Sequence, residues 1–256
     1  MKPLVAKIKP ARGISAFLHS GLLFVFPLLL FVLVRLDFVP LAFILIGLSK
    51  WRMLVVRPRF WLANIRANSI DIIVGVSSLI FMTQTNSALW QFVWALVYAL
   101  WLVLLKPRST VLYTSLQAAV GFVLGLTALY VAWPDAPLYW LVLATGGVCF
   151  LAARHFFDSF DEPYARLLSY LWGYFGAAVT WLLGHLLIVY PGKSGFIAQP
   201  LVLLVVIGAA LATAYYLDHF DRFAAFAKKQ ILFVSLGVVL LLLVSLFYEG
   251  SNLLLR

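Results

Sequence analysis

The chain has 256 residues, of which 64% are apolar and only 11% are charged, and its formal net charge is +10. An ordinary soluble domain has about a quarter charged residues, so the composition excludes a water-soluble fold with a polar shell. The apolar residues form runs of about 20, the length that a helix needs to cross roughly 30 Å of hydrocarbon. The sequence therefore predicts an all-α integral membrane protein.

The apolar runs, taken in chain order, predict a polytopic transmembrane helical bundle of about nine spans. They cover residues 14–34, 36–56, 69–83, 87–105, 111–132, 136–153, 165–189, 200–217 and 231–248. The connections between them carry proline, glycine, asparagine or charged residues, and most are too short to hold a separate domain. We therefore expect residues 1–256 to form a single membrane domain.

The first two runs each leave an alternative open. The first run continues to Val34 without a small-residue cleavage pattern, which favours a retained span over a cleaved signal peptide. The second is interrupted by Lys50 and Arg52, so a re-entrant segment is its rival interpretation. If this run spans the membrane, both side chains are expected to extend to the cytoplasmic headgroups.

The basic residues predict the orientation. With nine spans and a cytoplasmic N-terminus, only Arg35, Lys193 and Arg256 of the 19 Lys and Arg residues lie outside. This is the asymmetry that the positive-inside rule requires, and a re-entrant second segment would destroy it. The C-terminus is then external, and the net charge of +10 indicates contact with anionic lipid headgroups on the cytoplasmic side, not with nucleic acid. Short loops and the retained first span favour a prokaryotic cytoplasmic membrane.

Three longer cytoplasmic segments, residues 57–68, 155–164 and 218–230, must carry any cytoplasmic chemistry. The first has the pattern of a short amphipathic helix in the membrane interface. Its apolar residues Phe60, Trp61 and Ile65 would face lipid, while Arg59 and Arg66 would face water.

A doubled Asp-x-Phe-Asp pattern occurs at residues 158–161 and 218–221. Both copies follow even-numbered spans, so both are expected at the cytoplasmic face. Clustered carboxylates there could hold Mg²⁺ bridging to a substrate phosphate, and arginines could neutralise that phosphate. The candidate acidic site is Asp158, Asp161, Glu162, Asp218 and Asp221, the metal ligands would come from its four aspartates, and the candidate phosphate or headgroup contacts are Arg57, Arg59 and Arg66.

A simpler interpretation of the same carboxylates is helix capping and ion pairing. Asp158 stands one helical turn after Arg154, and Asp218 one turn before Arg222, which are spacings that favour ion pairs. Acidic residues before a helix also interact favourably with the positive end of its dipole. We favour this interpretation over a metal site.

A resemblance to a known family rests on the segment Arg57-Pro58-Arg59-Phe60-Trp61-Leu62-Ala63-Asn64. It resembles the Arg-Pro-Arg-x-Trp-x-x-Asn segment of some intramembrane aromatic prenyltransferases, which also have nine spans. Asp158 and Glu162 are spaced like that family's second acidic motif. The resemblance implies a metal-dependent enzyme acting on a lipid phosphate or diphosphate. In that family the arginine segment precedes the first span, whereas here it follows the second, and the first acidic motif is reduced to Asn64, Asn68 and Asp71.

Small residues predict close helix packing in the later spans. Gly121 and Gly125 form a G-x-x-x-G pattern, and small faces follow at Gly146-Gly147, Gly173 with Gly176, and Gly208-Ala-Ala. They fit packing within the chain or association into a homo- or hetero-oligomer, and we favour packing within the chain.

The function expected from these patterns is the handling of a lipid or small molecule, or service as a subunit of a membrane assembly. Under the proposed topology no charged residue falls at the centre of a span, which disfavours an ion-coupled transporter. The single cysteine, Cys149, excludes an internal disulfide. No cofactor is evident, and Mg²⁺ belongs only to the alternative, a membrane enzyme acting on a lipid phosphate or diphosphate.

Overall fold

The computed structural model describes residues 14–53, 55–132, 136–185 and 199–220, and all regular elements in these ranges are helices. Five of the described helices are long and apolar enough to cross a membrane, which confirms the predicted class of all-helical membrane protein. The chain forms two compact units, residues 1–113 and 114–256, and each is described by itself.

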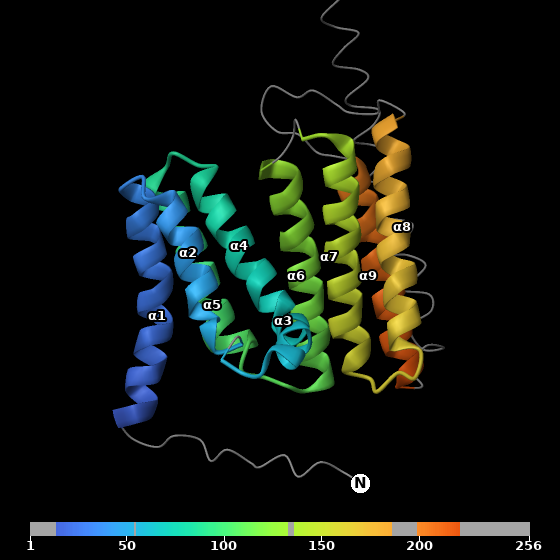
Figure 1. Cartoon of the computed structure of the whole chain (residues 1–256), viewed down its shortest axis with the longest axis horizontal. Coiled ribbons are helices and arrows are strands. Elements are labelled where there is room, and N and C mark those ends of the chain that lie inside the picture. The colour runs from blue at the N-terminus through green and yellow to red at the C-terminus, as the bar shows by residue number, and fades with distance from the viewer. Residues whose placement is uncertain (1–13, 54, 133–135, 186–198, 221–256) are drawn as a thin grey trace, which may run out of the picture. The chain divides into compact units, whose positions relative to one another are not determined.

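The first unit packs four apolar helices together (Figure 1). They are α1 (Ile14–Arg35), α2 (Val39–Ser49), α4 (Ser69–Thr83) and α5 (Ala88–Leu100), the last continued by the π-helical turn η3 (Trp101–Leu105). α5 packs against α1 and α4, and α2 packs against α4. Leu30, Ile46, Leu79 and Tyr98 are fully buried where these helices meet.

The second helix is shorter than its apolar run predicts. α2 has 11 residues and ends at Ser49, and the 3₁₀ turn η1 (Trp51–Met53) follows it. The expectation that Lys50 extends to the headgroups is wrong, because its side chain turns inward and forms an ion pair with Asp71. A buried carboxylate gives this lysine the partner that it would otherwise find in water or headgroups.

A short helical segment precedes α4, as the amphipathic pattern predicts. It consists of η2 (Pro58–Phe60) and α3 (Trp61–Ala67), and it is bent by 61° relative to α4. Its apolar residues Phe60, Trp61 and Ile65 are exposed. A helix with exposed apolar residues at this angle suits the membrane interface, although that location stays a prediction.

The second unit contains α6 (Val111–Ala132), α7 (Leu138–Asp158), α8 (Ala165–His185) and α9 (Gln199–His219). α7 and α8 lie side by side, and α9 packs against α8 (Figure 1). Two of the predicted small faces meet here, because a Cβ atom on Gly173 would lie 3.0 Å from the carbonyl oxygen of Gly146. The buried hydroxyl of Tyr130 ties α6 to both neighbours through Thr145 (3.3 Å) and Thr180 (3.0 Å).

Several predictions concern residues beyond the described ranges. The ninth predicted span, residues 231–248, lies there, as do the N-terminal basic segment, Lys193 and Asp221. The number of nine spans and the orientation of the termini therefore stay predictions.

Candidate functional site

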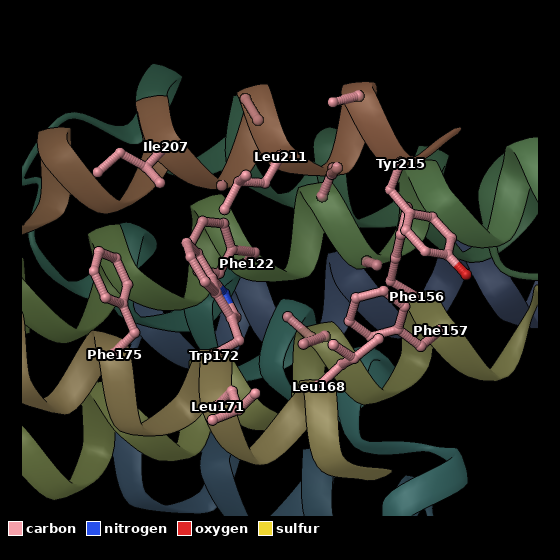
Figure 2. Close-up of a pocket in the computed structure, with 18 of the residues that line it drawn as sticks. Phe122, Phe156, Phe157, Leu168, Leu171, Trp172, Phe175, Ile207, Leu211 and Tyr215 are labelled. Carbon is pink, nitrogen blue, oxygen red and sulfur yellow. The ribbon is translucent and has the colours of Figure 1, made fainter. Parts of the chain in front are cut away.

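A large apolar cavity lies among α6, α7, α8 and α9 of the second unit and has a volume of about 1100 Å³. Aromatic side chains form much of its wall (Figure 2), namely Phe122, Phe156, Phe157, Trp172 and Phe175. Opposite them, α9 contributes Ile207 and Leu211 together with small residues.

Small residues on α9 form part of the wall of this cavity. Gly208, Ala209 and Ala212 all line it. At Gly208 the approach is close, because a Cβ atom there would lie 2.9 Å from a ring carbon of Phe122 and 3.1 Å from one of Trp172. The predicted small face of this helix is therefore real, and it forms one wall of a cavity.

Polar groups border the cavity near the connection between α7 and α8. Ser115, Tyr215 and Asp218 line this end. The Tyr215 hydroxyl donates a hydrogen bond to Glu162, the residue that follows the first Asp-x-Phe-Asp copy. An apolar cavity with polar groups at one end matches the distribution of polarity in an amphiphile.

The two Asp-x-Phe-Asp copies meet at this end of the unit. The ring centroid of Phe160, from the first copy, lies 4.8 Å from that of His219, from the second, and 5.1 Å from that of Tyr215. The aromatic residues make this contact, while Asp158 and Asp161 lie on the exposed side of the connection. Asp218 is also exposed.

A second, polar hollow of about 330 Å³ lies at the α7–α8 connection. Arg154 and Asp158 form the predicted ion pair on its wall, with 2.8 Å between Nη2 and Oδ1. The other terminal nitrogen of Arg154, Nη1, is buried and has no hydrogen-bond partner in the described residues. The remaining lining residues are Asp161, Glu162, Pro163, Ala165 and Arg166.

The arginines named as phosphate or headgroup contacts belong to the first unit. Arg57, Arg59 and Arg66 are all exposed, and the guanidinium of Arg59 lies 4.6 Å from the centroid of the Phe60 ring. Their pairing with a ligand at the acidic residues stays a prediction. Across the described ranges, no group of three or more His, Cys, Asp or Glu residues gathers as a metal site, and the Mg²⁺ site, which includes Asp221, stays a prediction.

Sequence reasoning missed a buried ion cluster around Asp71 in the first unit. Lys50 and Lys106 both pair with Oδ2 of this carboxylate, the latter at 2.6 Å, and the Trp101 indole nitrogen donates to Oδ1 at 3.0 Å. Asp71 and Lys50 are 7% and 8% exposed, so both charges are withdrawn from solvent. The sequence signal for this cluster is the placement of Lys50 toward the end of the second apolar run and of Asp71 near the start of the third.

The π-helical turn η3 sets the positions of two members of this cluster. The Lys106 amide donates to the Trp101 carbonyl at 2.9 Å, a bond that spans five residues. Such turns insert an extra residue into a helix and often occur at functional sites. Here the turn allows Trp101 and Lys106 to contact one carboxylate, which connects α2, α4 and the end of α5.

The second unit thus holds an apolar cavity beside a polar hollow, and the first unit holds a buried ion cluster. The cavity and the hollow have the room for a ligand, whereas the cluster is satisfied by its own partners. No protein-family model matches this sequence, and no curated protein or solved structure shows significant similarity to it.

Proposed function

We propose that this membrane protein binds a lipid in its second unit, with the acyl chains in the cavity among α6–α9. The observation that carries the proposal is the cavity itself, which has about 1100 Å³ of space between apolar walls and polar groups at one end. Ligand pockets are mostly apolar, with a few polar groups that fix the orientation of the ligand. Tyr215 and Asp218 would have that role here.

The chemistry of the walls favours a lipid over a water-soluble ligand. Phe122, Trp172 and Phe175 offer no charge to a polar solute, and a route for ions or water would need polar groups along its length. Lipids with acyl chains surround every helix that lies in a bilayer. It can enter between helices without first crossing water.

Filling the cavity should remove the bound lipid. Ala212 lines the cavity on α9, whereas Thr213, the next residue, bonds its hydroxyl to the Ala209 carbonyl and lies outside the lining. We expect Ala212→Phe to lower the lipid retained after detergent purification by about tenfold, equivalent to 1.4 kcal/mol. Native mass spectrometry of the purified protein measures the retained lipid.

Thr213→Phe is the matched control, because it adds the same ring to the same helix. It should retain as much lipid as the parent protein. Equal retention by the parent and both variants would contradict binding in this cavity.

We also propose the finer topology of nine spans in a prokaryotic cytoplasmic membrane, with the N-terminus inside and the C-terminus outside. The asymmetric placement of lysine and arginine supports it. Lipids with anionic headgroups are the expected partners of its basic cytoplasmic loops, as distinct from the lipid bound in the cavity.

Cysteine labelling in intact cells tests this orientation. Ser194→Cys, beside Lys193, should react with a membrane-impermeant maleimide, whereas Ser109→Cys, near Lys106, should react only after lysis. The native Cys149 gives little background, because it is fully buried. Labelling of Ser109→Cys from outside would overturn the orientation.

A further inference from the structure

We infer that the polar hollow at the α7–α8 connection binds the headgroup of this lipid and selects one that carries both a phosphate and an ammonium group. The inference rests on the proposed function, since the hollow is assigned to the same ligand as the cavity. Three features support it: the adjacent walls of the two spaces, one unpaired donor and one unpaired carboxylate.

The hollow and the cavity adjoin each other. Glu162 lines the hollow and Tyr215 lines the cavity, and the hydrogen bond between them joins the two walls. On α7, Phe157 lines the cavity and the next residue, Asp158, lines the hollow. The hollow is therefore within reach of the headgroup of a lipid whose chains occupy the cavity.

Arg154 provides the contact for the phosphate. Asp158 holds its Nε at 3.1 Å and its Nη2 at 2.8 Å, which fixes the direction of the guanidinium. The buried Nη1 has no partner in the described residues, and a buried charged donor left without a partner is energetically unfavourable. A phosphate oxygen is a strong acceptor for this group. Arg166, also in the lining, adds positive charge.

Asp161 provides the contact for the ammonium group. It is exposed, its φ is 52°, and it forms no hydrogen bond or ion pair with a described residue. The lining has two arginines and three acidic residues, so its formal charge is −1. An anionic headgroup would add to that negative charge. A headgroup with both charges can pair its phosphate with Arg154 and its ammonium with Asp161.

The test compares two lipids that differ in the headgroup alone. The purified full-length protein is equilibrated with vesicles of equal phosphatidylethanolamine and phosphatidylglycerol with identical chains, and native mass spectrometry counts each bound lipid. We expect about tenfold more bound phosphatidylethanolamine, which corresponds to one charge-assisted hydrogen bond. Asp161→Asn should bring the ratio close to one, and Arg154→Gln should lower the binding of both lipids about tenfold.

A matched control is available at Asp37. Its φ is 60°, close to that of Asp161, and it is also exposed. Asparagine tolerates this left-handed conformation, so both Asp→Asn variants should fold, and Asp37→Asn should keep the parent's lipid ratio. Equal binding of both lipids by the parent would overturn the headgroup inference alone. A preference that survives Asp161→Asn would also overturn it, whereas binding of neither lipid would overturn the proposed function.

Discussion

Replacing Asp71 by leucine should lower the free energy of unfolding by about 3–5 kcal/mol. The carboxylate is the shared partner of Lys50, Lys106 and the Trp101 indole. Without it, Lys106 can turn to solvent because its side chain is 38% exposed, but Lys50 stays buried without a counter-charge. Equilibrium unfolding of the purified protein in mixed micelles, followed by circular dichroism, measures the loss.

Removing the unpaired charge of Lys50 as well should restore most of this stability. The double variant Asp71→Leu/Lys50→Met replaces an ion pair by apolar groups, an exchange that is often neutral or stabilising in buried sites. We expect its free energy of unfolding to lie within about 1.5 kcal/mol of the parent's. A single Asp71→Leu variant as stable as the exposed control Asp37→Asn would show that the cluster does not stabilise the first unit.

Gly176→Ala should lower the free energy of unfolding by about 1–3 kcal/mol, although alanine is the better helix former. A Cβ atom on Gly176 would lie 2.4 Å from Sγ of Cys149, which is fully buried on α7. Either α8 must move away from α7 or the Cys149 side chain must leave its position. The same unfolding measurement reports the cost.

Gly147→Ala gives the matched control on the facing helix. Apart from the adjoining backbone of its own helix, no atom lies within 4 Å of its added Cβ, so helix propensity should dominate and raise stability by about 0.5–1 kcal/mol. The double variant Gly176→Ala/Cys149→Ala should be more stable than the single variant Gly176→Ala, because it lacks the sulfur atom with which the new Cβ collides. Equal stabilisation by Gly176→Ala and Gly147→Ala would contradict the close α7–α8 packing.

Apolar run length predicted most helix positions, because the bilayer imposes that length directly. The runs at 69–83 and 111–132 match α4 and α6 at both ends. The prediction for the second run, residues 36–56, is wrong at its C-terminal end, because a tertiary contact decides the position of Lys50 there. The local sequence predicts a headgroup position for Lys50, because its partner, Asp71, lies 21 residues away in the chain and on another helix.

The candidate site was predicted only in part. The pairing of Asp158 with Arg154 followed from helical spacing, and it is present. The cavity could not be predicted, because small residues permit close packing at some positions and line open space at others. Gly173 allows close contact between α7 and α8, and Gly208 allows the rings of Phe122 and Trp172 to approach α9 closely. Ala212, one turn further along α9, lines the cavity. Likewise, the bond between Glu162 and Tyr215 joins residues 53 apart, which no local pattern reveals.

The most direct test of lipid binding in the second unit is photo-crosslinking with a lipid that carries a diazirine in the middle of an acyl chain. The purified protein is irradiated in bilayer nanodiscs, and labelled residues are identified by peptide mass spectrometry. Cavity residues such as Phe122 and Trp172 should be labelled in the parent protein, and unlabelled lipid should compete for these positions. Ala212→Phe should abolish that labelling and leave the label on the exposed Leu143 unchanged. Labelling confined to exposed positions, with Phe122 and Trp172 unlabelled in the parent, would contradict lipid binding in this cavity.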